Sequence, residues 1–174
     1  MEVTQEGLLC EFGVYTGGTI NFIAARIDKE INGFDSFEGL PESWTSTVQK
    51  VAFKMNGLPR VRDNVILHKG WFSEFLPTWI NKYRGPILFL HIDADLYSST
   101  KTVLDLLADR MTPGTIIQFD EYFNFPNWKH NGEFRAFQEF VEKYKVEYDY
   151  IGYTKGDGMQ VAVKIKAISS LDSD

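Results

Sequence analysis

The 174-residue sequence is poor in cysteine and histidine and contains no long run of apolar residues. Its single cysteine, Cys10, cannot form a disulfide within the chain, which favours a reducing compartment and a role in the core. No charged-then-apolar leader and no stretch long enough to cross a bilayer is evident, so we expect a cytoplasmic protein with no membrane partner. Basic residues number 18 against 24 acidic ones, and the net charge of −6 disfavours binding to nucleic acid.

What the chain does contain is a regular alternation of strand-like apolar runs and segments of helical period, together with 44% hydrophobic residues. This alternation predicts an α/β protein with a mostly parallel, seven-stranded, Rossmann-like sheet, helices on both faces and an antiparallel hairpin at the end. We expect one domain over residues 1–166 and a frayed tail over 167–174. The expected strands are about Leu8–Phe12, Ile31–Asp35, Asn64–His68, Ile87–Ile92, Thr115–Phe119, Glu147–Tyr153 and Met159–Ile165. The expected helices are about Gly18–Lys29, Thr47–Asn56, Phe72–Lys82, Ser98–Met111 and Glu133–Tyr144.

The first strand leads into a glycine-rich turn, Glu11-Phe12-Gly13-Val14-Tyr15-Thr16-Gly17-Gly18-Thr19. A strand, a glycine turn and a helix in this order are typical of a nucleotide-type cofactor loop. An acid at the strand end disfavours a pyrophosphate and suits S-adenosylmethionine, which has a cationic sulfonium and a free amino group. Asp35 ends the second strand, where a carboxylate commonly accepts the ribose hydroxyls. Simple turn chemistry is the alternative, and a nicotinamide cofactor would use Asp35 in the same way.

Acidic residues also follow the fourth and fifth strands. Asp93 ends the run Leu90-His91-Ile92, and Asp120 and Glu121 end the run Ile117-Gln118-Phe119. Because neighbouring strands lie ~5 Å apart, these carboxylates can converge, and oxygen ligands favour Mg²⁺ or a similar divalent cation. Such a cation would hold and acidify an acceptor hydroxyl, which predicts oxygen methylation. The alternative is that Asp95 caps the following helix, Asp120 pairs with Arg135 or Lys129, and no metal binds.

Five blocks of sequence together resemble the macrocin-type O-methyltransferase family of class I, S-adenosylmethionine-dependent enzymes. The family includes macrolide-sugar methyltransferases, and the resemblance covers nearly the whole chain. The blocks are the glycine turn above, Phe34-Asp35-Ser36-Phe37-Glu38-Gly39-Leu40-Pro41, Lys69-Gly70-Trp71-Phe72 with Leu76-Pro77, His91-Ile92-Asp93-Ala94-Asp95-Leu96-Tyr97, and Asp120-Glu121-Tyr122.

The resemblance implies a set of site residues. It places Mg²⁺ at Asp93, Asp120 and Glu121, with Asp93 and Glu121 in catalytic roles. It places the cofactor against Glu11, Gly13, Gly17, Gly18, Thr19, Asp35, Ser36, Gly70, Trp71, Phe72 and Asp93. Trp71 is as readily explained as a core residue. The sugar enzymes usually have a second aspartate at position 121, so the glutamate here is a departure.

Two further departures concern the acceptor. The segment from Glu42 to Pro59 is short compared with longer family members, which implies an acceptor pocket that is open or completed by another subunit of a homo-oligomer. That segment lacks the family's basic histidine, so deprotonation falls to metal activation alone, Glu121, His91 or His130. His91 is also expected as a hydrogen-bonded core residue. The aromatic and amide-rich segment from Tyr122 to His130 either walls the acceptor site or packs as a lid on the core.

The sequence therefore predicts a Mg²⁺-assisted O-methyltransferase acting on a small hydroxylated molecule such as a sugar or glycosyl group. An NAD(P)-dependent oxidoreductase is the first alternative, and it would need a pyrophosphate-friendly turn where Glu11 stands. A cofactor-binding or assembly subunit without catalysis is the second alternative, because the acceptor region is short.

Overall fold

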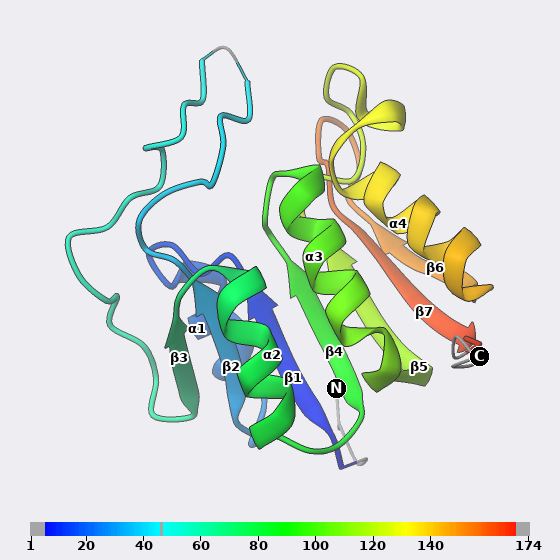
Figure 1. Ribbon diagram of the computed structural model, residues 1–174, viewed down its shortest axis with the longest axis horizontal. Coiled ribbons are helices and arrows are strands. Elements are labelled where there is room, and N and C mark those ends of the chain that lie inside the picture. Colours follow the sequence, from blue (N-terminus) through cyan, green and yellow to red (C-terminus); the bar gives the residue numbers. More distant parts are fainter. Residues whose placement is uncertain (1–5, 46, 170–174) are drawn as a thin grey trace.

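The computed structural model describes residues 6–45 and 47–169, which form one seven-stranded sheet in the order β3-β2-β1-β4-β5-β7-β6 (Figure 1). β1 to β5 are parallel, and β7 is antiparallel to both of its neighbours. This arrangement confirms the expected sheet and its final hairpin. The strands are β1 (Leu8–Phe12), β2 (Ile31–Asp35), β3 (Val65–Lys69), β4 (Ile87–Ile92), β5 (Met111–Phe119), β6 (Glu147–Tyr153) and β7 (Val161–Ala167).

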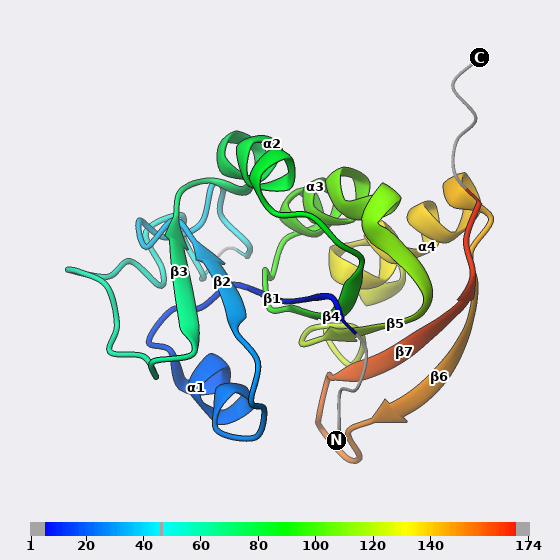
Figure 2. The same ribbon diagram turned by 90° about the horizontal axis from the view of Figure 1, so that it is seen from below.

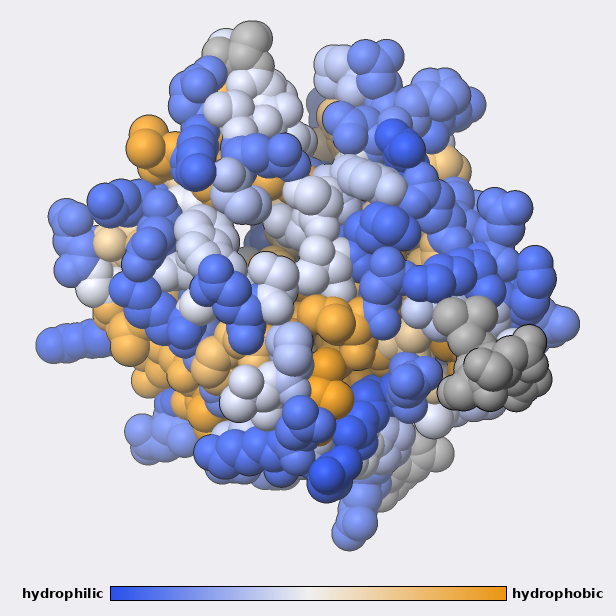
Figure 3. Space-filling view, viewed as in Figure 1, coloured by the Kyte–Doolittle hydropathy of each residue, from blue (hydrophilic) through white to orange (hydrophobic). Residues whose placement is uncertain are grey.

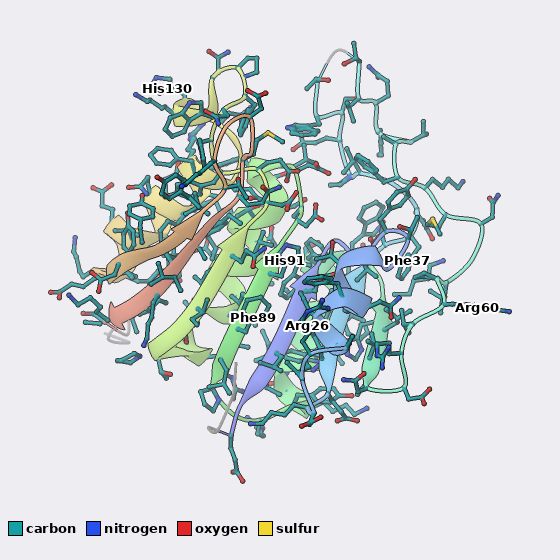
Figure 4. All side chains as sticks on the ribbon, turned by 180° about the vertical axis from the view of Figure 1, so that it is seen from behind. Arg26, Phe37, Arg60, Phe89, His91 and His130 are labelled. Carbon is teal, nitrogen blue, oxygen red and sulfur yellow. The ribbon has the colours of Figure 1, made fainter. Side chains whose placement is uncertain are left out.

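The helices cover the two faces of the sheet unequally. Figure 2 shows α1 on one face beside β1, β2 and β3, and α2, α3 and α4 on the other. Within the described residues, no helix covers β4, β5, β7 and β6 on the α1 side (Figure 4). The helices are α1 (Gly18–Ala24), α2 (Phe72–Lys82), α3 (Tyr97–Leu107) and α4 (Gly132–Tyr144), with 3₁₀ turns η1 (Ala108–Arg110) and η2 (Trp128–His130). None of these helices is long and apolar enough to span a bilayer.

The larger core lies between the sheet and the three helices on its α2–α4 face. α4 contributes Phe137 and Phe140, which are buried against Phe119 of β5 and its neighbours because they recur on one side of the helix. A smaller cluster around Ile20 and Ile31 lies under α1. Cys10 is fully buried in the larger core, as the sequence suggested. Because residues of the central strands are buried in this core, the positions of the carboxyl ends of these strands are fixed.

The helix expected over Thr47–Asn56 does not form, and residues 36–64 connect β2 to β3 as a long loop. Local side-chain bonds compete with a helix here, because Thr45 Oγ1 accepts the backbone N–H of Val48 and Ser43 Oγ accepts that of Lys50. Val51 is 72% exposed, so the segment also has no apolar face to bury. This expectation was wrong because an isolated helical pattern needs packing to be stable.

Smaller differences concern the ends of elements. α1 stops at Ala24 rather than Lys29, and the Asn64 side-chain amide donates to the carbonyls of Ala24, Ile27 and Lys29 in place of further helical turns. β5 begins at Met111, whereas the expected strand starts at about Thr115, so Pro113 and Gly114 lie inside the strand. Of the expected frayed tail, residues 170–174 lie outside the described part of the chain.

Candidate functional site

The carboxyl ends of β2, β1, β4 and β5 are joined by backbone hydrogen bonds that continue the parallel ladder. Gly13 N–H donates to the carbonyl of Phe34, Asp93 N–H to that of Phe12, and Asp120 N–H to that of Ile92, at 2.8–2.9 Å. The strand order also reverses between β1 and β4, and ligands of open α/β sheets bind at such a switch point. The glycine turn and the acidic residues after β4 and β5 therefore lie at one edge, as the sequence predicted.

Gly13 allows the glycine turn to pass directly over the end of β4. Its φ is 94°, and a Cβ atom at this position would overlap the carbonyl oxygen of Asp93. Only glycine tolerates both the dihedral and the contact. Asp35 then organises the rest of the turn, since its Oδ2 accepts the backbone N–H groups of Val14 at 2.9 Å and Tyr15 at 2.8 Å. Asp35 and the first glycine of the expected cofactor loop, Gly13, are thus structural partners at the strand ends.

A cleft of about 570 Å³ opens at this edge. Figure 3 shows a hollow beside the 36–64 loop, and the lining residues Asp93 and Glu121 place the ends of β4 and β5 at this cleft. Aromatic and apolar side chains form much of its wall. Among the described residues, five carboxylic acids and no lysine, arginine or histidine face it. The lining residues are Gly13, Tyr15, Asp35, Ser36, Gly39, Leu40, Pro41, Trp44, Phe53, Gly70, Trp71, Phe72, Ser73, Glu74, Asp93, Ala94, Asp95, Ser98, Ser99, Thr102, Glu121 and Met159.

The structure brings most of the sequence-predicted site residues to this cleft. Gly13, Asp35, Ser36, Gly70, Trp71, Phe72, Asp93 and Glu121 line it, whereas Glu11, Gly17, Gly18, Thr19 and Asp120 do not. Trp71 precedes α2 and is half-buried at the cleft wall rather than enclosed in the core. Gly17 has a φ of 82° and is the N-cap residue before α1, so its role in the structure is to start that helix.

Burial and mutual repulsion change the acidity of the carboxyl groups after β4. Burial, reinforced by the Asp120 carboxylate, raises the pKa of Asp93 to about 7. Burial together with Asp120 and Asp35 raises the pKa of Asp95 to about 7 as well. Asp95 also has a φ of 57°, a left-handed conformation that non-glycine residues seldom adopt. These groups hold protons near neutral pH unless a cation compensates their charge.

Glu121 and Glu133 form a second pair of buried acids after β5. Burial is the larger cause and the adjacent Glu133 the second, and they raise the pKa of Glu121 to about 11. Glu133 is fully buried, and its carboxylate oxygens accept the backbone N–H of Glu121 at 2.9 Å and that of Ala94 at 3.4 Å. Glu133 thereby links the first turn of α4 to the ends of both β4 and β5. Oε2 of Glu121 has no hydrogen-bond partner among the described residues.

Two groups of potential metal ligands share Asp93. Asp93, Asp95 and Glu121 form one group, and His91, Asp93 and Asp120 form the other, with the ligand atoms of each group within 4.8 Å of one another. The oxygen-only group faces the cleft and suits a hard cation such as Mg²⁺. Its membership differs from the predicted set by including Asp95 instead of Asp120.

Sequence reasoning underestimated Asp95 and missed Glu133. The metal-free alternative predicts Asp95 as a helix cap, but α3 has no side-chain cap, and Asp95 faces the cleft instead. Arg135, one of the two expected partners of Asp120, pairs with Glu139 at 2.9 Å instead. Asp120 accepts a hydrogen bond from Gln160 at 3.2 Å. The separation of two residues between Asp93 and Asp95 was the sequence feature that could have identified Asp95 as a site residue.

His91 is buried in the sheet, as the core alternative predicted. Its Nδ1 lies 3.1 Å from Oε2 of Glu11, its register neighbour on β1, and both side chains are at most 1% exposed. Burial lowers the pKa of His91, but the Glu11 hydrogen bond and the nearby Asp93 and Asp120 outweigh it, so the pKa lies above its usual value. His130, in contrast, lies exposed in η2 at the far end of the molecule (Figure 4).

The segment after Glu121 packs mainly on the protein itself. Trp128 meets Phe123 and Phe134 in edge-to-face contacts, and the Asn124 amide donates to the carbonyls of Gly156 and Gly158 in the β6–β7 turn. None of residues 122–130 lines the cleft. One edge-to-face contact, between Phe125 and Trp44 of the 36–64 loop, joins the segment to the cleft wall. The described geometry therefore agrees with the lid alternative.

The sheet order and the arrangement of helices are those of the Rossmann-like class I methyltransferase fold. Crystal structures with this fold include CalS11, a calicheamicin methyltransferase, with a TM-score of 0.71 and 22% identity over 91% of this chain and 72% of that one. The O-methyltransferase NovP gives a TM-score of 0.68 and 23% identity over 93% of this chain and 73% of that one.

Residues 2–152 match the macrocin O-methyltransferase (TylF) family, and the chain belongs to this family. Among curated relatives, 8-demethyl-8-(2,3-dimethoxy-α-L-rhamnosyl)-tetracenomycin-C 4′-O-methyltransferase of Streptomyces olivaceus is 30% identical over 141 residues. The match covers 67% of this chain and 53% of the relative, so the chain spans about half of that protein's length.

Proposed function

We propose that this protein is an S-adenosylmethionine-dependent O-methyltransferase that methylates a sugar hydroxyl of a small natural product. The observation that supports it best is the convergence of Gly13, Asp35, Asp93 and Glu121 on one cleft at the switch point of the sheet. Membership of the macrocin O-methyltransferase family supports the reaction class. The relative from Streptomyces olivaceus is, by its name, a methyltransferase of a rhamnosyl-bearing tetracenomycin, which supports a glycosyl acceptor.

The cofactor end of the cleft is built from the glycine turn and the end of β2. Asp35 has three of its lone-pair sites occupied by backbone N–H groups, including that of Phe37 at 2.6 Å, and retains capacity for one ribose hydroxyl. The carboxylates facing the cleft, with no basic side chain among them, favour a cationic sulfonium over a pyrophosphate. This charge distribution weighs against a nicotinamide dinucleotide.

The acidic end of the cleft fits a divalent cation. Asp93, Asp95 and Glu121 supply oxygen ligands, and the unpartnered Oε2 of Glu121 is a buried acceptor that a cation would satisfy. When bound, S-adenosylmethionine supplies an electrophilic methyl group and Mg²⁺ supplies a Lewis acid for the acceptor oxygen. The metal and the full ligand set are part of the proposal.

The protein's own residues then position the acceptor and take its proton. Trp44 offers an aromatic face for a sugar or ring system at the cleft wall, and Trp71 and Phe72 are proposed to lie against the cofactor, as the resemblance implies. Glu121 is the proposed acceptor of the hydroxyl proton in its ionised form. Without a cation, burial and Glu133 raise the pKa of Glu121 to about 11 and keep it protonated; a bound cation would compensate its charge and leave a carboxylate oxygen free to take the proton. The methyl carbon passes from sulfur to the acceptor oxygen as the O–H bond breaks, so S-adenosylhomocysteine and the methyl ether are the products.

We place the methyltransferase domain over residues 1–166, its partner in the class of small hydroxylated molecules, and the protein in the cytoplasm, where S-adenosylmethionine is made. The cleft opens to solvent beside the 36–64 loop (Figure 3), which is compatible with completion by a second subunit.

Calorimetric titration of S-adenosylhomocysteine tests the cofactor assignment. We expect micromolar binding to the wild type and a loss of about tenfold or more in Asp35→Asn, because one of the two Asp35 oxygens that accept backbone N–H groups becomes an amide donor. Asp63→Asn is the matched control, since Asp63 is exposed outside the cleft. No binding to the wild type would contradict the proposed function, and equal binding by Asp35→Asn would remove Asp35 from it.

A further inference from the structure

β6 forms one edge of the sheet, and its outer side has no neighbouring strand among the described residues. Figure 2 shows β6 outermost, beyond β7 and on the opposite side of the molecule from β3. An edge strand presents a row of N–H and C=O groups with which another strand can pair. Six of the seven residues of β6 are exposed, so no loop or helix of the described chain covers this edge.

The sequence of β6, Glu147-Tyr148-Asp149-Tyr150-Ile151-Gly152-Tyr153, gives this edge little of the usual protection. It contains no lysine, arginine or proline, the residues that commonly block pairing at an exposed edge. Three of the eight large hydrophobic residues that are exposed in the described structure lie in this one strand: Tyr150 at 56%, Ile151 at 49% and Tyr153 at 69%. Such a concentration of exposed apolar side chains is typical of an interaction surface.

Tyr150 is already held in place by neighbours on the α4 side of the strand. Its hydroxyl lies 2.9 Å from that of Tyr122 and 3.3 Å from that of Tyr148. Gln138 of α4 donates to the hydroxyls of both neighbours, at 3.3 and 3.4 Å. A partner would therefore meet an aromatic side chain whose conformation is fixed, so the entropic cost of ordering it at an interface is small.

Two acids and one lysine favour one direction of pairing. Glu147 and Asp149 lie in the first half of β6, and the exposed Lys155 lies two residues beyond its end. A parallel copy in register would place each acid beside its own counterpart. An antiparallel copy instead brings the acidic end of one strand toward the lysine of the other, so the two edges are complementary in charge. The charges therefore favour two copies related by a two-fold axis.

The same charges favour one register. Opposite residues of an antiparallel pair point their backbone groups either toward each other or away, so the axis between identical strands passes a residue position. An axis at Asp149, or one residue before it, places acids opposite acids. With the axis at Tyr150, Glu147 lies opposite Tyr153 of the other copy. Asp149 then lies opposite Ile151, and no like charges meet. An axis at Ile151 would fall on the bulge in β6.

We propose that two copies of this chain associate through antiparallel pairing of β6 about a two-fold axis at Tyr150, which joins their sheets into one. The two-fold symmetry closes the assembly at a dimer, whereas pairing of β6 with β3 of another copy would continue into a filament. β6 lines no part of the cleft and lies across the sheet from the 36–64 loop, so the second copy would lie away from the cleft (Figure 1). The pairing is independent of the proposed methyl transfer.

The competing explanation is a monomer whose edge is protected by its irregular backbone. The register between β6 and β7 shifts between Glu147 and Tyr148 and again between Tyr150 and Gly152. Bulges of this kind can twist an edge strand away from partners. Both explanations account for the exposed side chains of β6. They differ in the mass of the protein in solution and in which β6 residues of two copies can be cross-linked.

Sedimentation equilibrium of the complete chain measures self-association. We expect the wild type to approach twice its chain mass of 20.0 kDa at micromolar concentration. Ile151→Lys and Tyr153→Lys should each weaken the dimer by at least about tenfold, because a lysine on an edge strand opposes pairing. Val51→Lys and Leu58→Lys are matched controls, since both residues are apolar and exposed but lie in the 36–64 loop. A monomeric wild type at about 100 μM, a mass that rises beyond a dimer, or equal affinity in all four variants would overturn the proposal.

Disulfide cross-linking tests the register, because the single native cysteine, Cys10, is buried and does not compete. Tyr150→Cys places a thiol opposite its own copy, and we expect covalent dimers at least about tenfold faster than for Val51→Cys. In case Tyr150→Cys disturbs its hydroxyl contacts, Glu147→Cys is mixed with Tyr153→Cys, and the mixed disulfide should exceed random pairing. Equal rates for Tyr150→Cys and Val51→Cys, or random pairing in the mixture, would overturn the proposed register and axis.

Discussion

Glu133 on α4 accepts the backbone N–H of Glu121 at 2.9 Å, so a helix residue fixes the position of an acid that follows a strand. The same carboxylate reaches the N–H of Ala94, between Asp93 and Asp95, at 3.4 Å. The two acidic loops therefore share one buried anchor that is not itself part of the cleft wall. The spacing of the candidate metal ligands depends on α4 as much as on the sheet.

Removal of this anchor is expected to destabilise the fold. Glu133→Ala leaves two buried N–H groups without their acceptor, and we expect a loss of about 2–4 kcal/mol in the free energy of unfolding. Glu142→Ala, at an exposed position of the same helix, is expected to change it by less than about 0.5 kcal/mol. Urea denaturation in the presence of chelator measures both. Equal stabilities of the two variants would show that Glu133 is not the anchor.

Gly13 and Gly18 offer a test of the glycine turn. Gly13→Ala forces a Cβ onto the Asp93 carbonyl at a φ of 94°, and we expect a loss of at least about 2 kcal/mol in stability together with loss of S-adenosylhomocysteine binding. Gly18→Ala meets no atom within 4 Å and lies in α1, where alanine is favoured. Thermal unfolding measures the stability of both variants. A Gly13→Ala variant that is more stable than Gly18→Ala would contradict this account.

The pH dependence of stability follows from the buried Asp93. Its pKa is 3.8 in the unfolded chain and about 7 in the folded protein, so the folded state retains a proton that the unfolded state has lost. This contribution to stability is complete below about pH 4 and disappears as the pH rises through about 7. Asp93→Asn is therefore expected to be more stable than the wild type by about 1–3 kcal/mol near pH 8 without metal.

The wild type and Asp93→Asn must be compared in the presence of chelator. A bound cation would stabilise the wild type and reverse the sign of the stability difference. Asp109→Asn, at an exposed position in η1, serves as the control and is expected to show the wild-type pH profile. Thermal unfolding across the pH range measures the difference between variants. A stability difference between Asp93→Asn and wild type that did not grow from acid to neutral pH would contradict the burial of an ionisable Asp93.

A divalent cation should stabilise the protein more at higher pH. Asp93 and Asp95 both have pKa values of about 7, so protons compete with the metal below neutrality. We expect millimolar Mg²⁺ to raise the unfolding temperature at about pH 8, and to have a much smaller effect at about pH 6. Asp95→Asn should reduce the effect, because Asp95 belongs to the oxygen-only group. Equal stabilisation at both pH values would argue against binding at these carboxylates.

Much of the fold and part of the site could be predicted from the sequence. Continuous apolar runs such as Ile87–Ile92 identify central strands because only buried parallel strands need them. The family motifs predicted that Asp93 and Glu121 lie at the same edge of the sheet, and both residues line the cleft there. Glu133 could not be found this way, because an acid in the first turn of a helix is equally explained by the helix dipole.

Other features depend on packing that sequence does not encode locally. Glu11 stands at a strand end, where an acid suggests cofactor binding, but its contact with His91 arises only from the register between β1 and β4. The left-handed backbone of Asp95 turns it into the cleft instead of toward the helix start. The helix expected within the 36–64 loop does not form, because local hydrogen bonds to Ser and Thr side chains compete with it. In each case, long-range or side-chain contacts outweighed the local pattern.

The most direct test is methyl transfer itself. The complete protein would be incubated with radiolabelled S-adenosylmethionine, Mg²⁺ and a set of neutral glycosides that includes rhamnosylated aromatic polyketides, with products identified by mass spectrometry. We predict one added methyl group on a sugar oxygen, and no product with Asp93→Asn or in the presence of chelator. Binding of S-adenosylhomocysteine with no label transferred to any hydroxyl would contradict the catalytic account and identify a cofactor-binding subunit.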